Sequence, residues 1–135
     1  MTTTSPTATA YAGLLYDDCD AGIEWLERVL GFERREVHRD DDGAITHAEV
    51  ILGGTIVMLG TAGAGREPFR SLPAGGRLIY IGVDDVLPLH DRAVAAHAEI
   101  ASPLESTDYG SQDFTVRDPE GNLWALGTYR PEAAV

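Results

Sequence analysis

Two side chains capable of acid–base chemistry, His47 and Glu49, are separated by one residue in an apolar segment. In a strand, residues two apart point to the same face, so the imidazole and the carboxylate would lie side by side. Histidine titrates near neutral pH, and such a pair can transfer a proton or orient a substrate by hydrogen bonding. The alternative is a solvent-facing strand edge without a chemical role. As metal ligands, these two residues alone lack a third donor.

The other reactive residue types form no comparable constellation. His38 lies in a charged segment, and His90 and His97 lie on a predicted helix, where a lone histidine is more often a surface residue. Cys19 is the only cysteine, so no intrachain disulfide is expected. Its aspartate neighbours oppose a thiolate, and we interpret it as structural. The sequence contains no phosphate-binding glycine loop and no Gly-x-Ser-x-Gly elbow.

Composition excludes several classes of function. The 135 residues correspond to one domain, and 22 acidic against 10 basic residues give a formal net charge of -12. Such a field repels phosphate backbones and anionic lipid, so we expect neither a nucleic-acid nor a membrane partner. No apolar run reaches transmembrane length, and residues 1–10 lack the features of a signal peptide. We therefore expect a cytoplasmic protein.

Hydrophobic periodicity predicts one unit of a strand, a helix and three further strands. An aspartate pair, Asp17 and Asp18, supplies the helix cap, and Gly31 ends the helix. The turn before the third strand is carried by Asp41, Asp42 and Gly43. The strands are expected at residues 11–16, 32–39, 45–52 and 55–59.

The same unit starts again after a connector rich in glycine and proline. Residues 11–18 align with 78–85, and residues 54–60 align with 121–127, both at an offset of 67. Two matches in one register indicate an internal repeat. We therefore expect a single domain over residues 1–135, with frayed ends at 1–10 and 131–135. Its parts are module one at about 9–60, a connector at 61–76 and module two at about 77–130. The second module is expected to hold strands at 78–83, 101–104, 112–117 and 122–128 and a helix at 87–98.

Two segments resemble the vicinal oxygen chelate superfamily, which includes glyoxalases, bleomycin-resistance proteins and extradiol dioxygenases. One is the helix end Val29-Leu30-Gly31-Phe32, and the other is Phe114 to Trp124 with its Asp-Pro-x-Gly-Asn turn. The resemblance covers about residues 9–130. It implies an α+β fold of two βαβββ modules whose mixed sheets form a cup that is completed by dimerisation.

The resemblance also identifies the positions at which metalloenzymes of this superfamily hold their ion. Each module of those enzymes supplies one ligand from the start of its first strand and a glutamate from its last strand. These positions fall on Tyr11 and Leu78, and on Met58 and Ala125. Such a set does not suit a divalent ion. We therefore expect a member deficient in metal ligands, with no metal and no cofactor.

The predicted cup has an apolar and aromatic lining in place of the ligands. Small-molecule sites are typically apolar cavities with a few polar groups. The alternative is that these side chains fill the space as an ordinary core and leave no ligand cavity. Weak catalytic candidates are His47 and Glu49, and the full set of candidate ligand-binding residues is Tyr11, His47, Glu49, Met58, Leu78, Tyr80, Leu123 and Ala125. The connector residues Arg66, Phe69 and Arg70 form either a lid over the cup or an ordinary mobile loop.

Three functions remain open at this point. The first is a metal-free homodimer that sequesters a small organic ligand, such as an antibiotic or an aromatic metabolite. Bleomycin-resistance members of the superfamily, which are acidic metal-free dimers, support this mode of action. The second is a lyase, isomerase or dioxygenase-type enzyme, either metal-independent through His47, Glu49 or Tyr11, or dependent on non-standard ligands. The third is an interaction module without a ligand.

Overall fold

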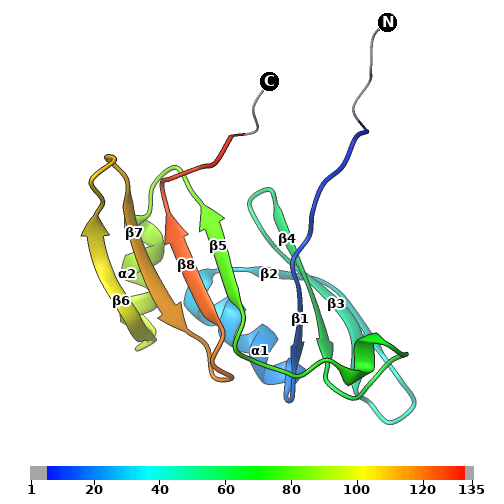
Figure 1. The fold of residues 1–135 in the computed structure, drawn as a ribbon. Coiled ribbons are helices and arrows are strands. Elements are labelled where there is room, and N and C mark those ends of the chain that lie inside the picture. The colour runs from blue at the N-terminus through cyan, green and yellow to red at the C-terminus, as the bar shows by residue number, and fades with distance from the viewer. Residues whose placement is uncertain (1–5, 133–135) are drawn as a thin grey trace, which may run out of the picture.

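The computed structural model describes residues 6–132 and contains two four-stranded mixed sheets (Figure 1). Of the frayed ends predicted at residues 1–10 and 131–135, residues 1–5 and 133–135 lie outside the described residues. The first module comprises β1 (Gly13–Tyr16), α1 (Cys19–Trp25), the π-helical turn η1 (Leu26–Leu30), β2 (Glu33–Arg39), β3 (Ile45–Leu52) and β4 (Thr55–Thr61). The second comprises β5 (Leu78–Gly82), α2 (Leu87–Ala95), β6 (Glu99–Ser106), β7 (Gln112–Arg117) and β8 (Leu123–Gly127). The connector between the modules contains one 3-10 turn, η2 (Phe69–Ser71).

The two sheets repeat one topology. The first sheet has the order β1-β4-β3-β2 and the second the order β5-β8-β7-β6, and in each the first and last strands of the module pair in parallel. Gly13 lies beside Met58 in the first sheet and Tyr80 beside Ala125 in the second, so both partners are shifted by the repeat offset. The predicted α+β fold of doubled βαβββ units is therefore confirmed.

Each sheet buries one face and leaves the other open. Ala48, Val50 and Val57 of the first sheet and Phe114 and Val116 of the second are buried in one continuous core. Because side chains alternate along a strand, their neighbours in sequence project from the opposite face. We call the face turned away from the core the open face of each sheet.

The helical segment formed by α1 and η1 begins and ends where the sequence predicts. The Asp18 carboxylate accepts a hydrogen bond from the Ala21 amide at 3.0 Å, and Gly31, with φ of 82°, ends the helical segment. Residue 22 must be small, because a Cβ there would lie 2.8 Å from the ring of the buried Tyr16. The aspartate and glycine signals thus position a short helix tightly against β1.

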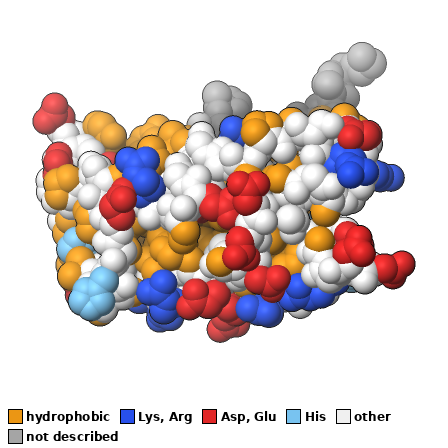
Figure 2. Space-filling view, turned by 90° about the horizontal axis from the view of Figure 1, so that it is seen from below, with side chains coloured by type: hydrophobic (Ala, Val, Ile, Leu, Met, Phe, Trp, Pro, Cys, Tyr) orange, Lys and Arg blue, Asp and Glu red, His pale blue; other side chains and the backbone are white. Residues whose placement is uncertain are grey.

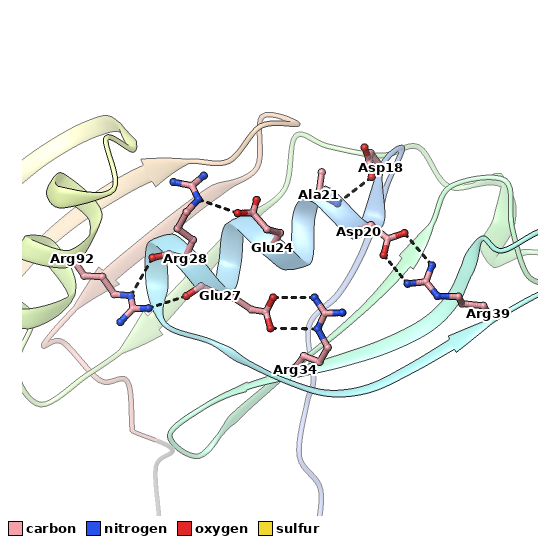
Figure 3. A network of polar contacts seen from close by, with 9 residues as sticks. All are labelled: Asp18, Asp20, Ala21, Glu24, Glu27, Arg28, Arg34, Arg39 and Arg92. Carbon is pink, nitrogen blue, oxygen red and sulfur yellow. Dashed lines mark hydrogen bonds and ion pairs between the residues drawn. The ribbon is translucent and has the colours of Figure 1, made fainter.

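Polar contacts fix the helical layer to its surroundings (Figure 3). Arg39 of β2 binds Asp20 at 2.7 Å, and Arg34 binds Glu27 at 3.0 Å. The Arg92 guanidinium of α2 donates to the carbonyl oxygens of Glu27 and Arg28 at the end of the first helical segment. These carbonyls have no partner within a helix, so the arginine satisfies them and joins the two modules.

A buried carboxylate forms the second link between the modules. Asp118, only 4% exposed, accepts hydrogen bonds from the Tyr16 hydroxyl at 2.7 Å, the Trp124 indole at 3.1 Å and the Asn122 side chain at 3.0 Å. Its other oxygen accepts the backbone amides of Glu120 and Asn122. Burial, followed by the Asp118 charge, raises the pKa of Tyr16 far above its ordinary value, so this hydroxyl remains a donor.

Several predicted boundaries move by a few residues. The second helix ends at Ala95 instead of residue 98, because His97 adopts a left-handed conformation with φ of 59° and β6 begins at Glu99. The first strand begins at Gly13 rather than at Tyr11. Within residues 6–132, no helix is long and apolar enough to cross a membrane.

Candidate functional site

A pocket of about 730 Å³ lies between the open face of the first sheet and the connector. Its floor comes from β1 and β4, one side comes from the start of β3, and residues 64–72 of the connector cover it. We call it the first-sheet pocket. It is lined by Tyr11, Gly13, Leu14, Leu15, Thr46, His47, Met58, Leu59, Gly60, Thr61, Ala64, Gly65, Arg66, Phe69 and Leu72.

The floor of the first-sheet pocket is open because it lacks side chains at its centre. A Cβ built on Gly13 meets no atom within 4 Å, so this residue leaves empty space above the sheet. Its strand partner Met58 supplies a flexible apolar wall. Gly60 lies in the same strand, where a Cβ would approach the Thr46 carbonyl oxygen to 3.2 Å. The floor therefore suits a flat apolar group.

The connector forms the cover of this pocket rather than an unrelated surface loop. Phe69 is 56% exposed and Leu72 is 52% exposed, although both line the pocket. The segment is held in shape locally, since the Gly63 amide donates to the Arg70 carbonyl and the Arg70 guanidinium donates back to the Gly63 carbonyl. Of the two predicted roles for the connector, the lid is therefore the one that the structure favours.

Arg66 adds a cation to this cover. Most arginines of the chain are paired with carboxylates, and acidic and basic side chains are interspersed on the face seen in Figure 2. Within residues 6–132, the Arg66 guanidinium makes neither an ion pair nor a side-chain hydrogen bond, although it lines the pocket. Its donors are available to a ligand.

His47 and Glu49 lie on the open face of the first sheet, as strand alternation predicts. The His47 Nε2 atom is 2.9 Å from the Glu49 carboxylate, and this hydrogen bond, aided by Arg35, holds the pKa of Glu49 below its ordinary value. Of the two residues, only His47 lines the pocket. Glu49 lies two residues further along β3 and does not line it. The pair can donate, accept or orient a hydrogen bond at the pocket wall.

The structure divides the predicted ligand-binding residues into two groups. Tyr11, His47 and Met58 line the first-sheet pocket. The other group, Leu78, Tyr80, Leu123 and Ala125, lies in β5 and β8 of the second sheet and does not line it. One chain therefore does not bring the whole predicted set into one pocket. A second pocket of about 310 Å³, lined by Tyr11 and Ile56 of the first module and Tyr80 of the second, lies between the modules.

The metal positions implied by the superfamily do not hold suitable ligands. Tyr11 precedes β1 and Met58 lies in β4, while Leu78 and Ala125 occupy the equivalent places in the second module. Leu78 and Ala125 have no donor atom, and a lone phenol with a thioether does not form a site for Zn²⁺, Ni²⁺ or Fe²⁺. The residues at these positions therefore do not fit a metal ion.

One polar residue near the site was not predicted. Glu36 of β2 lies directly opposite Glu49, so it shares the open face with His47 and Glu49. The signal was present in the sequence, since the Asp-Asp-Gly turn brings the second and third strands together as a hairpin. However, β-bulges shift the register of this hairpin at two points, and the pairing does not follow from counting residues back from the turn.

Comparison with known proteins identifies the class to which this fold and site belong. A family model described as the Glyoxalase/Bleomycin resistance protein/Dioxygenase superfamily matches residues 8–126. The chain belongs to this superfamily. Among curated proteins, an uncharacterized protein of Mycobacterium tuberculosis is 31% identical over 121 residues, which cover 84% of this chain and 70% of the relative.

Solved structures agree with this assignment. TioX from Micromonospora sp. ML1 matches with a TM-score of 0.74 and 34% identity, over 90% of this chain and 100% of TioX. A lactoylglutathione lyase from Agrobacterium tumefaciens matches with a TM-score of 0.69 and 21% identity, over 92% of this chain and 95% of the lyase. At the lower identity the likeness concerns the fold alone.

Proposed function

We propose that the protein binds a small aromatic molecule, such as an antibiotic or an aromatic metabolite, in the first-sheet pocket, without a metal at the positions used by metalloenzymes of its superfamily. The observation that carries this proposal is the pocket itself, with its glycine-rich floor and its apolar cover. Gly13 in the floor and Phe69 in the cover both line the space proposed for a planar ring. Apolar pockets with a few polar groups are typical small-molecule sites.

The polar groups of the pocket define the ligand further. Arg66 offers unpaired guanidinium donors in the cover, and His47 offers a ring nitrogen at the wall. An aromatic compound with a carboxylate, phenolate or carbonyl group would satisfy both the apolar floor and the arginine. We therefore propose that the ligand carries such an acceptor.

A pocket-filling variant tests the proposal. Gly13→Leu places a side chain in the empty space above the floor, and neither the surroundings of Gly13 nor its φ opposes a side chain. Gly54→Leu is the matched control, since Gly54 also has open space and a permissive φ but lies outside the first-sheet pocket. Each variant is screened by thermal unfolding against aromatic antibiotics and aromatic acids.

The expected result is selective loss of stabilisation. A compound at about 100 times its Kd stabilises the folded chain by about 2.7 kcal/mol. For a domain of this size, this raises the Tm by roughly 10 °C. Gly54→Leu should keep this increase and Gly13→Leu should lose it. Equal increases in both variants would place the ligand elsewhere, and no hit in a broad library would favour an interaction module.

We propose further that the cup is completed by a second copy of this chain. The open face of the second sheet presents Leu78, 69% exposed, and Tyr80, 39% exposed, and it is the repeat counterpart of the pocket floor. Leu78→Glu should convert a dimer to a monomer in sedimentation velocity, while the exposed Leu87→Glu in α2 should not. Identical sedimentation of both variants and the natural chain would contradict this arrangement. The lone reduced cysteine fits a cytoplasmic site of action.

A metal-independent enzyme is the second candidate, and the His47–Glu49 hydrogen bond favours it. In such an enzyme His47 would exchange a proton with the bound molecule and Glu49 would orient the imidazole. Incubating a ligand found in the screen with the natural chain and with His47→Gln distinguishes the two. Conversion of the compound by the natural chain alone would replace the binding function with a catalytic one.

A further inference from the structure

The outer half of the first sheet places like residues directly opposite one another. In the β2–β3 hairpin Glu36 faces Glu49 and His38 faces His47. Both pairs lie on the open face, since the intervening Val37 and Ala48 pack against the core. We call these four residues the His/Glu cluster. Like charges directly opposite on neighbouring strands destabilise a hairpin, so this pattern needs a compensating partner.

The donor atoms of the His/Glu cluster converge. Ligand atoms of Glu36, His47 and Glu49 all lie within 4.8 Å of one another, and His47 Nε2 is 2.9 Å from the Glu49 carboxylate. His38 Nε2 is 3.4 Å from the Glu36 carboxylate, and the two imidazole rings are 6.1 Å apart. Donors around a tetrahedral ion at ~2.1 Å are about 3.4 Å apart, so small side-chain rotations would close the set.

Within residues 6–132, Arg35 is the only arginine that approaches either carboxylate. Arg35 approaches Glu49 at 3.7 Å, which is longer than a hydrogen bond, and no arginine pairs with Glu36 among the described residues. Glu49 is the least exposed of the four, with 22% of its side chain accessible. A cation on the open face, between Glu36 and Glu49, would neutralise both carboxylates at once, which Arg35 does not.

We propose that Glu36, His47 and Glu49, with His38 as a fourth ligand, bind a divalent transition-metal ion on the open face of the first sheet. Two imidazoles and two carboxylates suit borderline ions such as Zn²⁺, Co²⁺ and Ni²⁺ better than Mg²⁺ or Ca²⁺, which prefer oxygen donors. The site lies in β2 and β3, away from the superfamily's ligand positions at Tyr11 and Met58. An ion bound here would make the prediction of a metal-free protein wrong, although the superfamily's own positions would still lack ligands.

The location connects the ion to the first-sheet pocket. His47 belongs to both the pocket wall and the His/Glu cluster, and Thr46 beside it also lines the pocket. The floor at Gly13 does not depend on the ion, so absence of metal binding would leave the proposed ligand function standing.

Calorimetric titration of the full chain, without an affinity tag, with Zn²⁺ tests this site, and Co²⁺ absorption reports the coordination. We expect one ion per chain and weaker binding of Mg²⁺. His47→Ala and Glu36→Gln should each weaken Zn²⁺ binding by about 100-fold or more, since loss of an outer partner alone costs 10–100-fold. Arg35→Gln should strengthen binding, because it removes a competing cation from Glu49.

The control is His97→Asn, which removes an exposed histidine at a left-handed position that asparagine accepts. It should bind Zn²⁺ like the natural chain. The proposal is overturned if Zn²⁺ does not bind at millimolar concentration, if His97→Asn weakens binding as much as His47→Ala, or if Glu36→Gln has no effect. Because the substituted side chains are exposed or half-buried, circular dichroism should show that all variants are folded.

Discussion

Replacement of Asp118 by asparagine should be among the most destabilising single changes that keep side-chain size. The carboxylate accepts three side-chain donors and two backbone amides at the junction between the modules. In one orientation of the new side chain, its NH2 group points at the two backbone N–H groups, which are also donors. In the other orientation, the NH2 group points at the donor groups of Trp124 and Asn122. At least two hydrogen bonds are lost either way.

The expected cost follows from these contacts. Hydrogen bonds to a charged group contribute about 1.5–3 kcal/mol each, so the loss of two in Asp118→Asn should lower the free energy of unfolding by roughly 3–6 kcal/mol. Tyr16→Phe removes a single donor from the same carboxylate and should cost about 1.5–3 kcal/mol. Tyr129→Phe is the control, because the Tyr129 side chain is half exposed, and it should change stability by less than about 0.5 kcal/mol.

Urea unfolding followed by tryptophan fluorescence and circular dichroism measures all three variants. The predicted order of stability is the natural chain and Tyr129→Phe, then Tyr16→Phe, then Asp118→Asn. The slope of the unfolding transition should stay unchanged if only native contacts are lost. A cost for Asp118→Asn below that of Tyr16→Phe would refute the assignment of Asp118 as the shared acceptor.

Three further predictions concern other parts of the fold. Gly22→Ala should destabilise by about 1–3 kcal/mol in urea unfolding despite the higher helix propensity of alanine, because its Cβ would overlap the Tyr16 ring; a gain in stability would contradict this packing. Burial, with the charges of Asp20, Glu120 and Asp18, raises the pKa of Cys19 to about 12, so a thiol reagent at pH 8 should label it only after unfolding, and rapid labelling of the native chain would disagree. The Arg39 hydrogen bond lowers the pKa of Asp20 in the folded chain. This pair therefore stabilises the fold above the pKa that Asp20 has in the unfolded chain, and the stabilisation is lost as the pH falls through the pKa of Asp20 in the folded chain. Arg39→Gln should raise the Asp20 pKa toward about 3.9 in a carboxyl NMR titration, and an unchanged value would show that Arg39 is not the cause.

Much of the fold could be predicted from local signals. Strands 45–52 and 112–117 match the predicted ranges, because alternation and turn residues define both ends of each. The helix boundary at Gly31 was predicted for a similar reason, since only a glycine readily adopts its φ of 82°. The internal repeat supplied the topology, which local propensity does not contain.

The site was harder to predict because it depends on how distant segments meet. His47 was predicted from strand alternation, and Tyr11 and Met58 from the superfamily's ligand positions, and all three line the first-sheet pocket. Leu78 and Ala125 were placed in the same cup because the superfamily forms it from two modules, but neither residue lines this pocket. Sequence alone does not specify which open faces meet.

The Asp-Pro-x-Gly-Asn turn has a role in packing that was not predicted from the sequence. It carried the family resemblance, yet its Asp118 binds Tyr16 of the first module, its Asn122 donates to Asp118, and neither residue lines the pocket. Glu36 belongs to no motif, and its role is proposed from its position directly opposite Glu49. Motifs therefore identified the fold, whereas the proposed metal site rests on cross-strand register.

Ligand mapping by NMR tests the central claim most directly. Glycine amides give well-separated signals, and Gly13, Gly60 and Gly65 line the first-sheet pocket, while Gly110 and Gly121 lie in turns of the second module and do not line it. At saturation with a compound that raises the Tm, the three pocket signals should move and the two turn signals should stay in place. Unmoved signals from Gly13 and Gly60 at saturation would show that the ligand binds elsewhere and would contradict the proposed function.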